Sequence, residues 1–287
     1  MGAFCALVYF GDRVIADFLE RIILESQTRF STVYRGGRER SVLVLGNSRG
    51  VNAIYAPATQ DIIGIPVLNL SYNGMSMELA EALLADYLDR NARPRLIVLE
   101  ITNLGDRSDL VNDLRVYCKF SNRLEKVLEK EAPKSAIMGR MSRLYNLNGE
   151  IFLRSLYYFK RSDQMWINRY RIAPSLLENI SRKPTEELQF ISNNTKSLSR
   201  ILQLMREKRI PTRLLISPYL PAYAERIPNL REWINRGQQL VGPDFQIWDY
   251  SNAIQEVPGF ADRVHMNEYG SRLLLGCLVR DGFFSGI

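Results

Sequence analysis

One serine of the chain stands in a setting that suits nucleophilic chemistry. Ser48 lies within residues 46–50, which read Gly-Asn-Ser-Arg-Gly and directly follow a short apolar run. Glycines on both sides let the backbone turn sharply, and a serine on such a turn presents its hydroxyl group. A helix after the turn would add free N–H groups and a positive dipole end. The same residue types are common in plain strand-to-helix turns, so the segment alone leaves both interpretations open.

The single histidine of the chain follows a carboxylate at a useful spacing. Two residues separate Asp262 from His265, so one turn can bring the carboxylate to the ring. A carboxylate on Nδ1 fixes the tautomer, supports the imidazolium and leaves Nε2 free to act as a base. The alternative is that Asn267 caps the next helix and that His265 is incidental. Because this segment occurs together with the Ser48 turn, the sequence favours a Ser-His-Asp triad.

Two weaker segments follow the second and third predicted strands. The backbone N–H of Gly74 and the side-chain amide of Asn103 could join the N–H of Ser48 as donors to an oxyanion. Arg49 is a candidate for holding an anionic substrate group, and equally for pairing with an acid. Asn73 is a further candidate for contact with substrate. Each of these residues is also an ordinary turn residue.

The elements that must position these side chains alternate along the sequence. Short runs rich in Val, Ile and Leu predict strands, and apolar positions repeating every three or four residues predict helices. The strands are expected at residues 41–45, 67–70, 96–101, 213–216 and 245–249, and the helices at 9–30, 77–90, 186–208 and 267–281. Long crossovers imply parallel pairing. We therefore expect an α/β fold with an open, mostly parallel, flavodoxin-like sheet, helices on both faces, and ligands at the carboxyl ends of the strands.

Positive charge is concentrated in one part of the chain. The 38 Lys and Arg and 31 Asp and Glu give a net charge of +7, and residues 139–183 hold nine basic, three acidic and seven aromatic residues. We expect an N-terminal helical segment, 1–40, and an α/β domain, 41–287, with a basic, aromatic helical insertion at about 115–183. Such an insertion suits an anionic polymer or membrane surface. A solvated basic face over an aromatic core is equally consistent.

Composition excludes several kinds of site. One histidine rules out zinc sites built on two or three histidines, and three widely separated cysteines argue against a disulfide framework or a cysteine zinc site. We therefore expect no metal and no cofactor. The early apolar run at residues 3–10 is shorter than the roughly 20 residues of a spanning helix. It is interpreted as a buried N-terminal segment or as the tail of a membrane anchor.

In their order, these segments resemble the four blocks of the SGNH, or GDSL-like, hydrolase superfamily. The resemblance covers residues 41 to about 280: Ser48 follows the first predicted strand, Gly74 the second and Asn103 the third, and Asp262-x-x-His265 precedes the last helix. It implies Ser48 as nucleophile, His265 as base and Asp262 as the acid that orients the base. It also implies an oxyanion hole formed by Ser48, Gly74 and Asn103.

Two positions depart from the usual pattern of that superfamily. Asn47 replaces the Asp of the GDS motif, and Ile101 stands where a Gly is usual, two residues before Asn103. In this the chain looks more like a divergent branch that handles acyl groups on cell-envelope polymers, related to the lipoteichoic-acid D-alanylation proteins. Members of that branch usually carry an N-terminal membrane anchor. The resemblance therefore favours the cell envelope or a membrane, while a cytoplasmic location stays open.

Residues 46–50 also match the G-x-S-x-G elbow of α/β-hydrolases. In those folds several strands precede the elbow, and the acid and the histidine come from separate loops. Here at most one predicted strand precedes Ser48, and Asp262 and His265 belong to one short segment. The sequence therefore favours the SGNH-like interpretation.

The sequence thus predicts a serine esterase or O-acyltransferase that acts on an acylated saccharide or a cell-envelope polymer. One alternative is a non-catalytic envelope or scaffold protein with the same fold. Another is a basic nucleic-acid-binding protein, for which a pI of about 9.3 is the first cue. No nucleic-acid recognition motif accompanies the charge, so no specific nucleic-acid partner is expected. The acyl group, the acceptor and the oligomeric state stay open.

Overall fold

Five parallel strands form the sheet of the protein. The structure, a computed structural model, describes residues 2–105, 110–180 and 187–287. The strands are β1 (Val42–Leu45), β2 (Val67–Asn69), β3 (Leu96–Glu100), β4 (Thr212–Ile216) and β5 (Ile247–Asp249). They lie in the order β2-β1-β3-β4-β5, and each pairs in parallel with its neighbours. The predicted α/β fold with an open parallel sheet is confirmed, and the strand order is the flavodoxin-like one.

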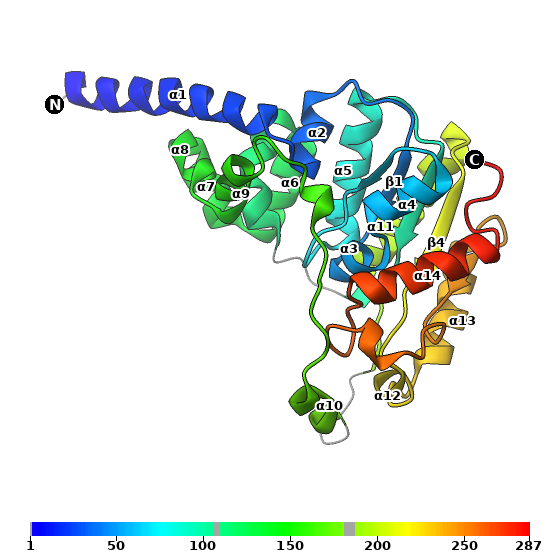
Figure 1. The fold of residues 1–287 in the computed structure, drawn as a ribbon. Coiled ribbons are helices and arrows are strands. Elements are labelled where there is room, and N and C mark those ends of the chain that lie inside the picture. The colour runs from blue at the N-terminus through cyan, green and yellow to red at the C-terminus, as the bar shows by residue number, and fades with distance from the viewer. Residues whose placement is uncertain (1, 106–109, 181–186) are drawn as a thin grey trace. The chain divides into compact units, whose positions relative to one another are not determined.

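Helices connect and follow these strands (Figure 1). They are α3 (Ser48–Ala53), α4 (Ala56–Ile63), α5 (Met77–Arg90), α10 (Pro174–Ile180), α11 (Ser192–Lys208), α12 (Pro221–Ala224), α13 (Leu230–Val241) and α14 (Glu268–Arg280). Short 3-10 turns lie at η1 (Thr102–Gly105), η3 (Asp163–Met165) and η4 (Val257–Gly259).

The strand order explains both the apolar strands and the place of a site. All residues of β1, β2 and β3 are buried, so their sequences are continuous apolar runs and not alternating ones. From β1 the chain moves outward to β2 and then returns past β1 to β3. Because such crossovers are right-handed, the outward and return connections cover opposite faces of the sheet. The crevice between the carboxyl ends of β1 and β3, where the order reverses, is the expected ligand position.

The N-terminal helix differs from the prediction, whereas α5 has the predicted bounds. The single helix expected at 9–30 is two helices, α1 (Gly2–Glu25) and α2 (Arg29–Arg35). Ser26 Oγ donates to the carbonyl of Ile23, and Thr28 caps α2 by accepting from the N–H of Ser31. These side-chain bonds to the backbone compete with a continuous helix. Helix α11 begins six residues later than expected, at Ser192, and residue 186 lies outside the described part of the chain.

Contacts divide the chain into two compact units, and each is described by itself. The helical unit comprises Met1–Glu39, Ala82–Ala92 and Ser108–Asp163, and the sheet unit comprises Arg40–Glu81, Arg93–Arg107 and Gln164–Ile287. The helical unit also contains η2 (Leu110–Phe120), α6 (Asn122–Glu131), α7 (Pro133–Met141), α8 (Arg143–Leu147) and α9 (Glu150–Tyr157). The predicted domain boundaries, with an insertion at about 115–183, stay a prediction. Within the described ranges, no helix combines the length and the apolarity needed to cross a membrane.

Several basic residues of the segment 139–183 have carboxylate partners within the chain. The pairs are Arg140 with Glu125 and Glu129, Arg143 with Asp17 and Glu20, Arg154 with Glu150, and Arg169 with Glu268. Arg182 and Lys183 lie outside the described residues. These pairs reduce the positive charge that is free for an anionic partner at 139–183, and that partner stays a prediction.

Candidate active site

Ser48 is the first residue of α3, immediately after the turn that ends β1. Asn47 caps the helix, since its Oδ1 accepts from the N–H of Arg49 at 2.9 Å. The flanking glycines are required by close packing. A Cβ on Gly46 would lie 2.7 Å from the Cβ of Glu100, and a Cβ on Gly50 would lie 2.6 Å from Ser71 Oγ. The Gly-Asn-Ser-Arg-Gly segment therefore seats the serine turn tightly against the carboxyl ends of neighbouring strands.

Ser48, His265 and Asp262 form one chain of hydrogen bonds. The distance from Ser48 Oγ to His265 Nε2 is 2.7 Å, and the distance from His265 Nδ1 to Asp262 Oδ2 is also 2.7 Å. The other carboxylate oxygen, Oδ1, accepts from the N–H groups of Val264 and His265 at 2.8 and 2.9 Å. This bend of the chain brings the His265 ring onto the carboxylate of Asp262. Both side-chain distances lie within the range for proton transfer between a nucleophile, a base and its orienting acid.

The electrostatics of the Asp262 carboxyl favour its ionised form. Burial raises the pKa of Asp262, but hydrogen bonds from the His265 ring and from backbone N–H groups lower it by more, so the pKa lies below its usual range. The carboxylate is therefore charged at neutral pH and can stabilise an imidazolium on His265. The two side chains are 37% and 24% exposed, which leaves the dyad open to solvent.

Asn267 caps α14, and the cap is compatible with the hydrogen bond between His265 and Asp262. Its Oδ1 accepts from the N–H of Gly270 at 3.1 Å, and its amide donates to the carbonyls of Pro258 and Tyr170 at 2.8 and 3.1 Å. The cap and the Asp262–His265 bend therefore occur together on neighbouring residues. The cap fixes the start of α14 against the loop that holds His265.

The three weaker candidates differ in their surroundings. Gly74 has a φ of 70° in a turn closed by the bond from the Met75 N–H to the Tyr72 carbonyl, a conformation that favours glycine. Asn73 is exposed beside it. Asn103 is fully buried, and its amide donates to the Met75 carbonyl at 3.1 Å. That bond uses one of the two N–H donors of the amide, so the side chain of Asn103 holds the Gly74 turn, and its expected role as an oxyanion donor stays a prediction.

Arg49 takes the second of its two expected roles, that of pairing with an acid. The side chain is 5% exposed, its guanidinium lies 3.4 Å from the ring centre of Tyr219, and its Nε is 3.7 Å from Glu100 Oε1. Nε also donates to Ser217 Oγ at 3.2 Å, and Ser217 Oγ donates to Glu100 Oε1 at 2.8 Å. Buried in this way, Arg49 ties α3 to the ends of β3 and β4, and its contact with an anionic substrate group stays a prediction.

Sequence reasoning missed Glu100 and Ser217, which complete this buried network. Glu100 is the one acid at the end of the apolar run of β3, and Ser217 directly follows β4. Their positions at the carboxyl ends of strands indicated that they lie near the site, but nothing in the local sequence indicates that they contact Arg49. Asn69, the last residue of β2, also contacts the helix that Ser48 begins, because its amide donates to the carbonyls of Gly50 and Ile54 at 3.0 and 2.8 Å.

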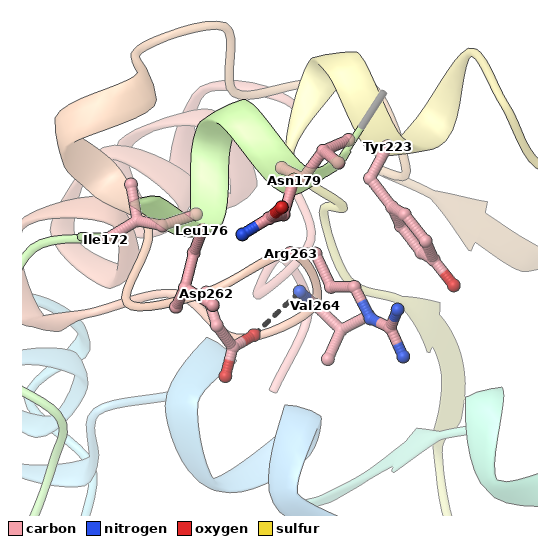
Figure 2. Close-up of a pocket in the computed structure, with 8 residues that line it drawn as sticks. Ile172, Leu176, Asn179, Tyr223, Asp262, Arg263 and Val264 are labelled. Carbon is pink, nitrogen blue, oxygen red and sulfur yellow. Dashed lines mark hydrogen bonds between the residues drawn. The ribbon is translucent and has the colours of Figure 1, made fainter. Parts of the chain in front are cut away.

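A cavity of about 350 Å³ adjoins the Asp262 side of the triad. Figure 2 shows α10 on one side of it and Tyr223 on the other, with the Asn179 amide directed between them. The lining is mainly apolar, with a few polar groups: Ile172, Leu176, Asn179, Ile180, Tyr223, Asp262, Arg263 and Val264. This size is in the range of small-ligand pockets. Among the described residues, no cluster of three or more His, Cys, Asp or Glu side chains is arranged to hold a metal ion.

Comparison with known proteins gives distant likenesses among solved structures. No protein-family model matches the sequence, and no curated protein matches it. Among solved structures, the chain is similar to one from Streptococcus pneumonia whose description names it, provisionally, a platelet activating factor. The identity is 16%, the TM-score is 0.42, and the match covers 85% of this chain and 84% of that chain. A likeness of this degree carries no argument about the reaction.

Proposed function

We propose that the protein is a serine ester hydrolase or O-acyltransferase with Ser48 as nucleophile, His265 as base and Asp262 as the orienting acid. One observation carries the proposal, namely the continuous hydrogen-bonded relay from Ser48 Oγ through His265 to Asp262, with both side-chain distances at 2.7 Å. The three residue types, their order of contact and the ionised state favoured for the acid agree with this chemistry.

The mechanism follows from the relay. His265 Nε2 takes the proton of Ser48 Oγ as Oγ bonds to the carbonyl carbon of an ester. The tetrahedral intermediate collapses, its C–O bond to the leaving alcohol breaks, and His265 protonates that alcohol. Water or a sugar hydroxyl then gives a proton to His265 and attacks the acyl carbon. The bond from that carbon to Ser48 Oγ breaks, and His265 returns the proton to Oγ. Asp262 stabilises the imidazolium in both halves.

Donors for the oxyanion are backbone groups in this proposal. The N–H of Ser48 lies at the start of α3, where N–H groups lack helical partners and the helix dipole is positive. The N–H of Gly74 is the second candidate, because its turn is fixed by the bond from Asn103 to Met75. Loss of one such donor typically raises a barrier by about 3 kcal/mol.

The substrate class comes from the resemblance and from the cavity. The proposed substrate is an acylated saccharide or cell-envelope polymer, as expected for the divergent SGNH-like branch. A mainly apolar cavity of about 350 Å³ beside Asp262, with Asn179 and Arg263 on its wall, has room for an acyl chain or one sugar. Whether water or a sugar hydroxyl accepts the acyl group depends on which one this region admits.

Labelling with a fluorophosphonate probe tests the proposal. The wild-type chain should react at one site, and Ser48→Ala should not react. Ser199→Ala is the matched control, because Ser199 is an exposed serine on α11 and should leave labelling unchanged. A folded wild-type chain that does not label, or equal labelling of Ser48→Ala, would contradict the proposal and favour a non-catalytic protein with this fold.

A further inference from the structure

Arg263 lies on the wall of the cavity beside the triad and has no acidic partner. It directly follows Asp262 and precedes His265 by two residues. Its side chain is exposed, and its guanidinium lies 5.1 Å from the ring centre of Tyr223, toward which Figure 2 shows it directed. No carboxylate of the described residues forms an ion pair with it. The guanidinium therefore keeps its N–H donors for a ligand.

A second arginine of the same unit shows the contacts of an arginine that holds the fold. Arg49 also stacks on a tyrosine, Tyr219, with its guanidinium 3.4 Å from the ring centre. Its side chain is 5% exposed, its Nε donates to Ser217, and its acidic partner is Glu100. Arg263 has the stacking contact but neither the burial nor the acid. Its position beside the triad is therefore better explained by contact with a ligand.

The surroundings of Arg263 fix the place of its guanidinium. Its carbonyl accepts from the N–H of Leu220 at 3.1 Å, which ties the loop to the start of α12. Tyr223 packs partly buried against the core and offers a ring face at cation–π distance. The planar fork of an arginine stacked in this way is already oriented, so less freedom is lost for each hydrogen bond formed. Such a fork suits a carboxylate or a phosphate, which it can bind through two parallel N–H bonds.

The other polar groups of the cavity wall are compatible with an anionic ligand that carries hydroxyl groups. Asp262 is the one carboxylate among the described lining residues. Its Oδ2 is bound to the His265 ring and its Oδ1 accepts from two backbone N–H groups, so its charge is compensated there. The amide of Asn179 donates to the carbonyl of Ser175 at 2.7 Å and keeps its Oδ1 for a hydroxyl. The apolar rest of the lining strengthens a charge-assisted bond by lowering the local dielectric constant.

The loop of His265 selects the alcohol part of an ester. Under the proposed function, on which this inference rests, His265 Nε2 must reach the oxygen of the leaving alcohol to protonate it. The alcohol, and later the acceptor, therefore lie on the His265 side of Ser48, and the acyl group lies away from it. Arg263 belongs to the His265 loop and faces the alcohol. We infer that Arg263 selects esters whose alcohol part is anionic, such as a sugar or polyol with a carboxylate or phosphate near the esterified hydroxyl.

Matched acetyl esters test the inference. In p-acetoxybenzoate and p-acetoxyphenyl phosphate the alcohol part is anionic, and methyl p-acetoxybenzoate is the neutral counterpart. Arg263→Gln should lower the ratio of kcat/KM for the preferred anionic ester to that for the neutral ester by roughly ten- to hundredfold, as expected for loss of a charge-assisted hydrogen bond. The ratio cancels any general loss of activity, and the two anions distinguish a carboxylate from a phosphate. The matched control, Arg231→Gln, removes an exposed charge of the sheet unit outside the cavity and should keep the wild-type ratio.

Binding to an inactive variant separates this inference from the proposed function. Calorimetric titration of Ser48→Ala should show tighter binding of the preferred anionic ester than of the neutral one, and Ser48→Ala/Arg263→Gln should lose that preference. Because Arg263 is exposed, these variants should fold. An unchanged ratio in Arg263→Gln, or no preference for either anion in wild type, would overturn the inference and leave the Ser48 chemistry intact. A chain that binds the anion through Arg263 but hydrolyses none of the esters would support the anion site and contradict the proposed function.

Discussion

The two units of the molecule depart from ordinary packing in opposite ways. In the sheet unit, Arg49 and Glu100 form an ion pair whose side chains are 5% and 0% exposed, directly behind the Ser48 turn. In the helical unit, Phe4 and Leu7 stand in solvent at 70% and 72% exposure. One unit buries charge and the other exposes apolar surface.

Each departure is costly for a folded chain in water, and this is what makes the comparison useful. Burial of two charges forfeits their hydration, which the mutual attraction of the pair only partly offsets. Exposed apolar side chains contribute no hydrophobic stabilisation while their surface stays in contact with water. The buried pair holds the turn that carries Ser48, and the exposed segment of α1 leaves apolar side chains uncovered within its own unit. The predictions below test these two departures separately.

The largest expected effect is on chemistry alone. His265→Ala should lower kcat/KM for a small acyl ester by roughly 10⁴-fold or more, because no second histidine exists to replace the base. Hydrolysis of p-nitrophenyl acetate is the assay. Retention of wild-type turnover would remove the histidine from the mechanism.

Asp262→Asn should affect both catalysis and acid stability. Loss of the charged orienting group should lower kcat by roughly 10³- to 10⁴-fold. A carboxyl group with a lowered pKa in the folded state stabilises the fold above its ordinary pKa of about 3.9. That contribution is lost as pH falls through the lowered value. Below about pH 4, the free energy of unfolding measured in urea should therefore fall more steeply with pH for wild type than for the Asn variant. Parallel pH dependences would argue against this ionised carboxylate.

The next largest expected effect concerns the buried ion pair of Arg49 and Glu100 behind the Ser48 turn. Arg49→Gln leaves Glu100 buried without its cation and should lower the free energy of unfolding by about 3–5 kcal/mol. The control is Arg200→Gln, which breaks an exposed pair with Glu81 in the same unit and should cost about 0–1 kcal/mol. Urea titrations measure both values. Equal losses in the two variants would mean that burial does not distinguish these pairs.

Most parts of this arrangement that sequence reasoning found were local in sequence, whereas the distant pair Ser48 and His265 was indicated by the joint occurrence of two local segments. Continuous apolar runs predicted β1 and β3, and the apolar repeat predicted α5 with its observed bounds. Asp262 and His265 form a bond between residues three positions apart, so spacing alone indicated it. These predictions succeeded because the residues involved lie within one turn or one element, where spacing and apolar pattern indicate the structure directly.

The parts that were missed depend on residues distant in sequence. Glu100 is 51 positions from Arg49, and no periodicity links a strand end to a helix start across that interval. The amide of Asn103 donates to the carbonyl of Met75 in another loop, and no local pattern indicates that contact. The helix expected at 9–30 ended early because Thr28 and Ser26 form capping and back-bonding contacts there. The first two contacts are tertiary and leave no local pattern, whereas the bonds of Ser26 and Thr28 span only three residues and compete locally with a continuous helix.

The smallest effects compare the same substitution in the two units. Gly50→Ala would place a Cβ 2.6 Å from Ser71 Oγ and 3.2 Å from the Cβ of Glu100, so the turn must shift. We expect a loss of about 1–3 kcal/mol of unfolding free energy. Gly11→Ala in α1 meets nothing within 4 Å, and it should raise helix stability by about 0.5–1 kcal/mol, because alanine orders into a helix at a lower entropic cost.

Urea unfolding measures the effect of Gly50→Ala, and far-UV circular dichroism during heating measures that of Gly11→Ala. If Gly50→Ala destabilises and Gly11→Ala stabilises, the result would support close packing around Ser48 and an unpacked helix at Gly11. If both substitutions stabilise, a Cβ at position 50 fits beside Ser71 and Glu100, and the close packing described for the Ser48 turn is wrong. If both destabilise, α1 packs against something near Gly11, and the open space described around that position is wrong.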